Sequence, residues 1–383
     1  MTNPFKISID PKRTYGLDIL RAIAIITILI FHGNVLLLNF NQPILFSWVR
    51  FDGVSIFFVL SGFLIGGILI KSIEKNEANF KTLLTFWKRR WLRTMPMYFI
   101  VLTIIFFLSI LKIANIDHPI FKYGYMEYSK VLQFYFFVQN IVSPHPSFFP
   151  EAWSLSIEEW FYIITPLTII LSMIIFRINL KKALLISSVL IIIFSMSLRL
   201  HYYSIINLDS MADFANYIRN RVFTRLDGMM YGVIGAYIYH YHNKFWLKYK
   251  YHSLGIGALL LILSEIAIGS SLKIGLFYSV FYFTLFSSGI LFLLPFLSDL
   301  KSGKGILYKT ITTISLISYS LYLINFMFVG GFLVLGTLTL FKIKADEFTL
   351  AYLSLSLFWI YSVSISILTY KYIELPFMNL REK

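Results

Sequence analysis

The chain has 383 residues, of which 58% are hydrophobic and only 14% are charged, whereas soluble domains average about 25% charged residues. The formal net charge is +15, and cysteine is absent, which excludes disulfides, thiolate nucleophiles and cysteine-ligated metals. Mean hydropathy is +0.73, so the composition is typical of a protein whose main solvent is lipid.

Apolar stretches close to 20 residues long recur along the whole sequence, and about 20 such residues in a helix cross the hydrocarbon core of a bilayer. We therefore predict an all-α, polytopic transmembrane helical bundle with about ten spanning helices, forming a single membrane domain over residues 1–383. The expected spans are 17–38, 51–73, 94–113, 154–176, 183–204, 222–241, 252–271, 275–297, 313–340 and 348–371.

Lysine and arginine accumulate in cytoplasmic loops of membrane proteins, and this bias predicts the orientation. With the N-terminus inside, most of the 34 basic residues fall on the cytoplasmic side. Both termini are therefore expected in the cytoplasm, and topology explains the positive charge without a nucleic-acid surface. The segments on that side are 6–13, 71–93, 177–182, 244–250, 301–309 and 371–383.

The first expected span carries two costly polar side chains, Arg21 and His32. They are separated by three helical turns plus about 20°, so they share a helix face about 16 Å apart along the axis. Asp18 lies one turn before Arg21 and can pair with it. Arg21 is therefore expected near the cytoplasmic side and His32 near the outside, although a structural hydrogen-bonding role is equally open for a lone histidine.

The second span contains Ser-Gly-x-x-x-Gly from Ser61 to Gly66, a pattern that lets helix backbones approach closely, and we interpret Ser61 as a packing residue. Before the third span, Arg89, Arg90 and Arg93 precede Pro96, which is expected in the first helical turn.

Arg90 and Arg93 are one turn apart, and guanidinium pairs at this spacing suit phosphate or pyrophosphate. The alternative is that these arginines are only a positive-inside signal.

The longest stretch without an expected span, residues 113–153, contains His118, His145 and a short apolar piece, residues 131–142. That piece is too short to cross comfortably, so we expect an interfacial or re-entrant segment. Long loops of this kind are often functional.

The fourth span begins with PEAWSLSIEEWFY, which places Glu158 and Glu159 close to its outer end. The depth matches that expected for His32, and a glutamate beside a histidine could orient it as a general base for a hydroxyl substrate. Interfacial glutamates can instead be simply solvated. No metal site is expected, because His240 and His242 point to different helix faces.

These motifs, in this order, resemble those of the acyltransferase 3 family, and the resemblance spans nearly the whole chain. The matching stretches are Arg21 to His32, GVSIFFVLSGF from Gly53, Arg90 to Arg93, WSLSIEEWFY from Trp153, RLDGMMYGVIGAY from Arg225, ISYSLYLIN from Ile317 and YIELP from Tyr372. Two positions depart from the family pattern: Asn325 stands where histidine is typical, and Trp160 stands where glutamine is common.

The resemblance implies a bacterial inner-membrane O-acyltransferase, with cytoplasmic acyl-CoA, usually acetyl-CoA, as donor. The acceptor would be a hydroxyl on an extracytoplasmic or lipid-linked glycan, such as O-antigen, lipopolysaccharide or exopolysaccharide. Arg90 and Arg93 would bind the donor phosphates, with Arg21 also involved. His32 would act as base or acyl carrier, and Glu158 would orient and charge it.

Three alternatives remain at this point. A secondary transporter or flippase of a glycan or small anion would also bury Arg and Glu, but it should show broken helices in repeated halves. A membrane scaffold would need none of these residues, and another acyl group, such as succinyl, could replace acetyl. Tyr319 and Tyr322 are candidates for lining a cavity.

Overall fold

The computed structural model describes residues 7, 9–11, 13–47, 51–76, 79–110, 128–141, 143–146, 148–269 and 274–380, and within these ranges it contains helices and no strand. The α-helices are α1 (Tyr15–Leu38), α2 (Gly53–Asn76), α3 (Phe80–Ile110), α4 (Tyr128–Tyr135), α5 (Ala152–Ile175), α6 (Leu180–Ile205), α7 (Met211–Phe214), α8 (Asp227–Tyr241), α9 (Asn243–Lys248), α10 (Lys250–Gly269), α11 (Tyr282–Asp299), α12 (Gly305–Ile324), α13 (Leu335–Leu340), α14 (Glu347–Thr369) and α15 (Leu375–Asn379). The described part of the chain also contains the π-helical segments η2 (Ala215–Arg219), η3 (Phe277–Phe281), η4 (Asn325–Val334) and η5 (Tyr370–Glu374).

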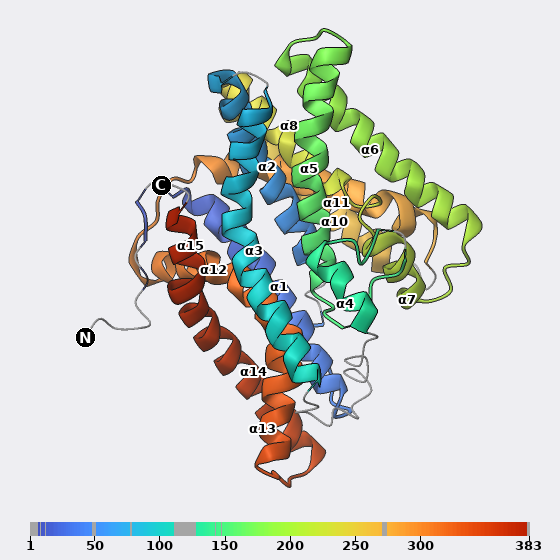
Figure 1. Cartoon of the computed structure of the whole chain (residues 1–383), viewed down its shortest axis with the longest axis vertical. Helices are drawn as coiled ribbons and strands as arrows, with labels where there is room; N and C mark the ends of the chain where they lie inside the picture. The colour runs from blue at the N-terminus through green and yellow to red at the C-terminus, as the bar shows by residue number, and fades with distance from the viewer. Residues whose placement is uncertain are drawn as a thin grey trace.

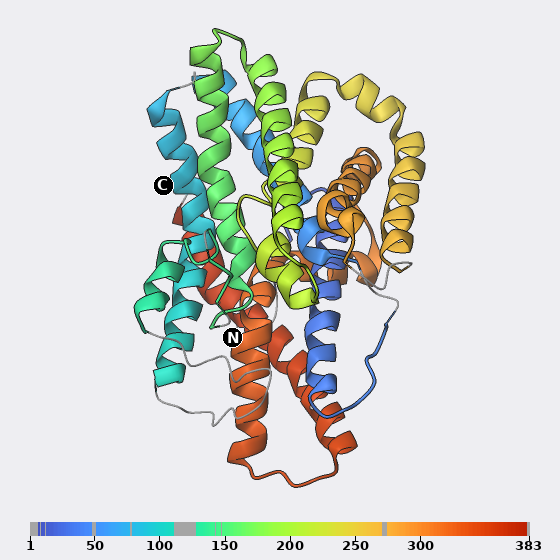
Figure 2. The ribbon, with the colours of Figure 1, turned by 90° about the vertical axis from the view of Figure 1, so that its right-hand side faces the viewer.

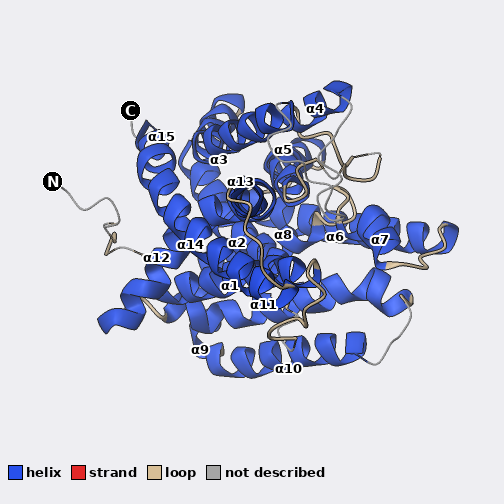
Figure 3. Ribbon diagram, turned by 90° about the horizontal axis from the view of Figure 1, so that it is seen from below, coloured by secondary structure: helices blue, strands red, loops and turns tan. Residues whose placement is uncertain are grey.

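Nine helices in the described ranges are long and apolar enough to cross a membrane, which confirms the expected all-α membrane bundle. The chain enters α1 and leaves α15 on the same side of the bundle, at the upper left in Figure 1, whereas the turn between α13 and α14 lies at the opposite end. The most buried spanning helix is α2, and the least buried is α10, which lies at the rim of the bundle (Figures 2 and 3).

The expected sixth span, residues 222–241, differs most from the structure, because it is helical only over the 15 residues of α8. The preceding residues form a turn whose backbone carbonyls bind buried polar side chains of α6. Ser195 donates to the Phe223 carbonyl at 2.7 Å, and Arg199 donates to the Thr224 carbonyl at 2.7 Å. These side chains satisfy carbonyls that the turn leaves without helical partners, so a non-helical segment is tolerated inside the bundle.

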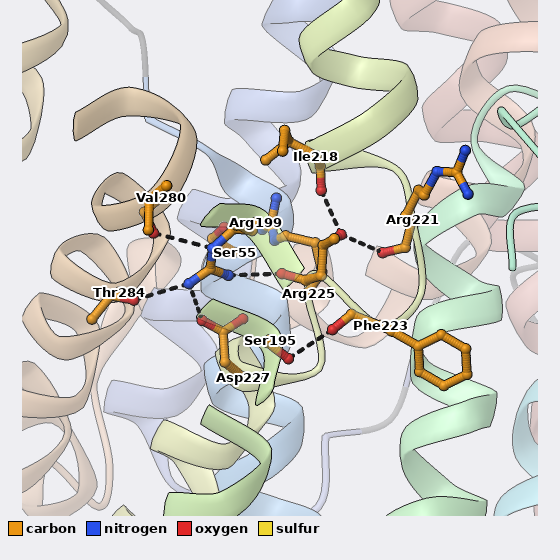
Figure 4. A network of polar contacts seen from close by, with 11 residues as sticks. Ser55, Ser195, Arg199, Ile218, Arg221, Phe223, Arg225, Asp227, Val280 and Thr284 are labelled. Atoms are coloured by element: carbon orange, nitrogen blue, oxygen red, sulfur yellow. Dashed lines mark hydrogen bonds and ion pairs between the residues drawn. The ribbon is translucent and has the colours of Figure 1, made fainter. Parts of the chain in front are cut away.

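Arg199 anchors this turn through a buried network that Figure 4 shows. Its side chain, fully buried, forms an ion pair with Asp227 at 2.7 Å and donates to the Val280 carbonyl at 3.1 Å and to Thr284 at 3.1 Å. A buried arginine in an apolar bundle is tolerated only when its donors are satisfied in this way. The network fixes the segment that leads into α8 against α6 and α11.

Helices α2 and α8 pack backbone against backbone along the middle of the bundle. A Cβ atom built on Gly62 would lie 1.9 Å from the Met229 carbonyl oxygen, and one built on Gly232 would lie 2.0 Å from the Val59 carbonyl oxygen. The glycines therefore bring the two helices together, as the Gly-x-x-x-Gly spacing predicts.

The third span is longer than expected. Helix α3 begins at Phe80, so Arg90, Arg93 and Pro96 lie inside the helix, and the expectation that Pro96 falls in its first turn is wrong. A helix of 31 residues is about 46 Å long at 1.5 Å per residue. It therefore extends well beyond the hydrocarbon core, whose thickness is about 30 Å. Proline inside a membrane helix is tolerated more readily than in a soluble helix.

Of the short apolar piece expected not to span, the structure describes residues 131–141: α4 ends at Tyr135, and the following turn is anchored inside the bundle. The buried Asn140 donates to the Trp153 carbonyl at 3.0 Å and to the Asn220 carbonyl at 2.5 Å. This turn thereby ties the segment before α5 to the segment before α8.

Candidate active site

A cavity of about 90 Å³ lies among α1, α2, α3, α5 and α12. Four of the five residues proposed from the sequence, Arg21, Arg90, Arg93 and Glu158, line it. Its other lining residues are Val54, Phe57, Phe58, Leu60, Ser61, Leu64, Ile65, Thr94, Ser154, Leu155, Tyr162, Ser318, Tyr319 and Tyr322. The bundle thus brings together three motifs that are far apart in the sequence, and it also confirms that Tyr319 and Tyr322 line a cavity.

The end of the cavity nearest the start of α1 is strongly basic. Arg21 lies 3.5 Å from the Asp18 carboxylate, which confirms the expected pair, and it also donates to Ser315 at 3.1 Å. Asp18 accepts from Arg13 and, at 2.6 Å, from Ser315. One buried carboxylate therefore faces two arginines, and the guanidinium groups of Arg90 and Arg93 add further positive charge to the same wall.

Glu158 lines the cavity, and its two carboxylate oxygens accept from cavity residues: Ser61 donates to Oε1 at 2.7 Å and Tyr162 donates to Oε2 at 3.2 Å. The interpretation of Ser61 as a packing residue is therefore wrong. Neighbouring residues on a helix point about 100° apart, so Gly62 meets α8 while Ser61 faces the cavity.

Glu159 points away from the cavity and is held by a different pair of donors. Thr94 donates to its Oε1 at 2.9 Å, and Trp91 donates to its Oε2 at 3.1 Å. Only one glutamate of the pair, Glu158, can therefore meet a ligand in this cavity.

His32 is not among the residues that line the cavity. Its Nδ1 lies 2.5 Å from Oδ1 of Asn325, and its ring lies 4.5 Å from that of Phe326. The hydrogen bonds of Glu158 in the described part of the chain go to Ser61 and Tyr162, so the expected pairing of Glu158 with His32 is replaced by a pairing of His32 with Asn325. An expected match in depth therefore did not determine which groups these two side chains contact.

Tyr322 connects the cavity with the His32 region. Its hydroxyl accepts from Ser154 at 2.6 Å and donates to the Glu151 carbonyl at 3.0 Å, and its own carbonyl accepts from Asn325 at 2.9 Å. The tyrosine thus lines the cavity and also supports the residue that holds His32.

Glu151, directly before α5, is a buried carboxyl group. Its Oε1 accepts from the Met327 amide at 2.8 Å, a donor made available where the helix changes to the π-helical η4. Burial raises the pKa of Glu151 to about 8, although backbone amides, that of Met327 foremost, act in the opposite direction. This group is therefore largely protonated at neutral pH.

A second cluster of charges was not foreseen from the sequence. Asp52 lies 3.7 Å from Arg219 and 3.6 Å from Arg225, and the Arg219 guanidinium lies 5.3 Å from the centre of the Trp153 ring. Burial alone would raise the pKa of Asp52, but the two arginines and hydrogen bonds from Ser55 outweigh burial and lower it. The signal for this cluster was the run of three arginines between residues 219 and 225, at the edge of an expected span.

Of the two loop histidines, His118 lies outside the described residues. His145 lies 3.1 Å from the Phe149 carbonyl through Nε2, and burial lowers its pKa to about 4. It therefore serves the fold of the segment before α5.

The chain is similar in sequence to known proteins. A family described as an acyltransferase domain matches residues 14–371. The peptidoglycan O-acetyltransferase OatA of Listeria monocytogenes is 33% identical over 40% of this chain and 24% of its own length. A putative O-acetyltransferase of Staphylococcus aureus, SACOL0978, is 30% identical over 58% of this chain and 34% of its own length. The chain thus aligns with about a quarter to a third of these curated relatives, and no solved structure matches it significantly.

Proposed function

Because this chain belongs to the acyltransferase family that it matches from residue 14 to residue 371, we propose that it is a multi-pass membrane O-acetyltransferase. It moves an acetyl group from acetyl-CoA to a hydroxyl of an extracytoplasmic or lipid-linked glycan, in the bacterial cytoplasmic membrane, with both termini in the cytoplasm. The observation that carries the proposal is that Arg21, Arg90, Arg93 and Glu158 line one cavity.

The basic end of the cavity suits the donor. The phosphates of coenzyme A would meet Arg90 and Arg93, which form planar, charge-assisted hydrogen bonds, with Arg21 adding charge from α1. The remaining wall is mostly apolar and aromatic, which suits the thin, largely uncharged pantetheine arm. The acetyl end would then point along the wall toward Tyr322.

His32 supplies the base in this proposal. The acceptor hydroxyl oxygen attacks the acetyl carbonyl carbon while its proton passes to His32. The carbon–sulfur bond breaks, coenzyme A leaves as a thiolate, and the protonated His32 neutralises that thiolate. Glu158 acts from the cavity wall, where it holds the Ser61 hydroxyl and balances the charge of Arg90 and Arg93.

The function is tested by comparing surface glycans of a strain that carries the gene with those of a deletion strain, using mass spectrometry of base-labile acyl groups. We expect the deletion to remove one ester-linked acetyl group, and reintroducing the gene to restore it. The mass of the lost group distinguishes acetyl from succinyl. Identical esters in both strains would contradict the proposal.

The donor site is tested with the double substitution Arg90→Ala plus Arg93→Ala in purified protein. A hydrogen bond to a charged group contributes roughly 1.5–3 kcal/mol, so we expect the Kd for acetyl-CoA, measured by calorimetry, to rise roughly 100-fold or more. The matched control is Lys88→Ala plus Arg89→Ala, which removes two charges from the exposed face of the same helix. Equal affinities in both double variants would show that Arg90 and Arg93 serve only membrane topology.

A further inference from the structure

Asn325, the first residue of η4, is fully buried and makes three hydrogen bonds through its side chain. Its Nδ2 donates to the Leu321 carbonyl at 2.7 Å and to the Tyr322 carbonyl at 2.9 Å. Its Oδ1 faces Nδ1 of His32 at 2.5 Å. The amide nitrogen thus uses both of its hydrogens on backbone carbonyls, and the amide oxygen faces His32.

This arrangement determines the tautomer of His32. Backbone carbonyls only accept hydrogen bonds, so the amide nitrogen must be the atom that faces them, and the reverse orientation would set an amide oxygen against two carbonyl oxygens. The oxygen that faces His32 can likewise only accept. Nδ1 of His32 must therefore carry the hydrogen, and in a neutral imidazole the lone pair then resides on Nε2.

Two phenylalanine rings flank the imidazole of His32, and its Nε2 makes no hydrogen bond within the described residues. Phe326 and Phe31 lie 4.5 Å and 5.7 Å from it, centre to centre. His32 is only partly buried, and its hydrogen bond within the described residues is the one made by Nδ1. Nε2 is thus the nitrogen that remains for an incoming hydroxyl group.

We propose that Asn325 is a positioning residue that holds His32 in the Nδ1–H tautomer, so that Nε2 is the atom that takes the proton of the acceptor hydroxyl. The reaction step rests on the proposed function. In that step the acceptor O–H bond breaks, Nε2 gains the proton, the oxygen bonds to the acetyl carbon and the carbon–sulfur bond of the donor breaks. The amide oxygen continues to accept from Nδ1–H while the ring is charged, so the ring does not move during transfer.

The tautomer can be tested without any activity measurement, by ¹⁵N NMR of histidine-labelled full-length protein in detergent at neutral pH. The His32 signals are assigned by their loss in His32→Ala. We expect a protonated-nitrogen shift for Nδ1 and an unprotonated one for Nε2, and a change in this pattern in Asn325→Leu. A wild-type spectrum with the hydrogen on Nε2 would overturn the inference even if the protein acetylates its substrate.

The effect on catalysis is tested with Asn325→Asp, which keeps the size of the side chain. A carboxylate against Nδ1 favours the charged imidazolium, so the acid limb of the pH–rate profile should move to higher pH by about one unit or more. Arg219, whose charge also acts on His32, is unchanged in this variant.

The control is Asn34→Asp, two residues from His32 on the same helix, where the side chain bonds instead to Leu45. We expect the larger shift for Asn325→Asp. If the acid limb of the pH–rate profile moved equally in the two variants, or did not move in Asn325→Asp, the positioning role of Asn325 would be contradicted. A wild-type protein with the expected tautomer but no transfer activity would contradict the proposed function alone.

Discussion

Replacing His32 with alanine should reduce acetyl transfer by roughly 100- to 10,000-fold, the range that a positioned general base contributes. The affinity for acetyl-CoA should stay within about twofold of wild type, because His32 does not line the cavity in which the arginines and Glu158 lie. The measurements are ester-linked acetyl on the acceptor, by mass spectrometry, and donor binding to the purified variant. A large loss of transfer with intact donor binding would separate the chemical step from the binding step.

His201→Ala is the matched control, since this histidine is exposed on α6 and its loss should leave transfer unchanged. Protein level in the membrane must be equal in both variants, because removing the hydrogen-bond partner of the buried Asn325 can also lower stability. Full acetylation by His32→Ala at a normal protein level would rule out any essential role for this residue, whether as base or as acyl carrier.

The helical membrane bundle could be predicted from the sequence because its apolar segments are long enough to cross a bilayer. In lipid, such segments form helices, since a helix satisfies its own backbone hydrogen bonds. The sequence also predicted Arg21, Arg90, Arg93 and Glu158 as candidate site residues, because ionisable groups are costly in apolar surroundings and are therefore rare there. The cavity that they share follows from helix packing, which the sequence alone does not specify.

The pairing of His32 could not be predicted in the same way. Position along a helix gives the depth of a side chain, but the partner depends on the rotation of each helix and on which neighbour lies opposite. Asn325 is 293 residues away from His32, and its amide gave no sign of a partner on α1. Arg219 was not predicted as a site residue for a different reason. It ends the short π-helix η2, before α8, which the hydropathy pattern did not reveal.

Gly62→Ala should be among the most damaging small substitutions in the chain. The added Cβ would lie 1.9 Å from the Met229 carbonyl oxygen and 2.7 Å from its carbonyl carbon, and backbone atoms cannot move aside as a flexible side chain can. Overpacking of this kind costs typically 1–3 kcal/mol and occasionally more. We expect a lower thermal unfolding temperature in detergent and a lower yield of folded protein.

Gly67→Ala on the same helix provides the control, because a Cβ there has no atom within 4 Å, and alanine is favoured over glycine inside a helix by about 1 kcal/mol. This variant should therefore be as stable as wild type or slightly more stable. Since α2 also carries Ser61 to the cavity wall, separating α2 from α8 by Gly62→Ala should weaken acetyl-CoA binding as well. Equal stability of the two variants would contradict a backbone-to-backbone contact between α2 and α8 at Gly62.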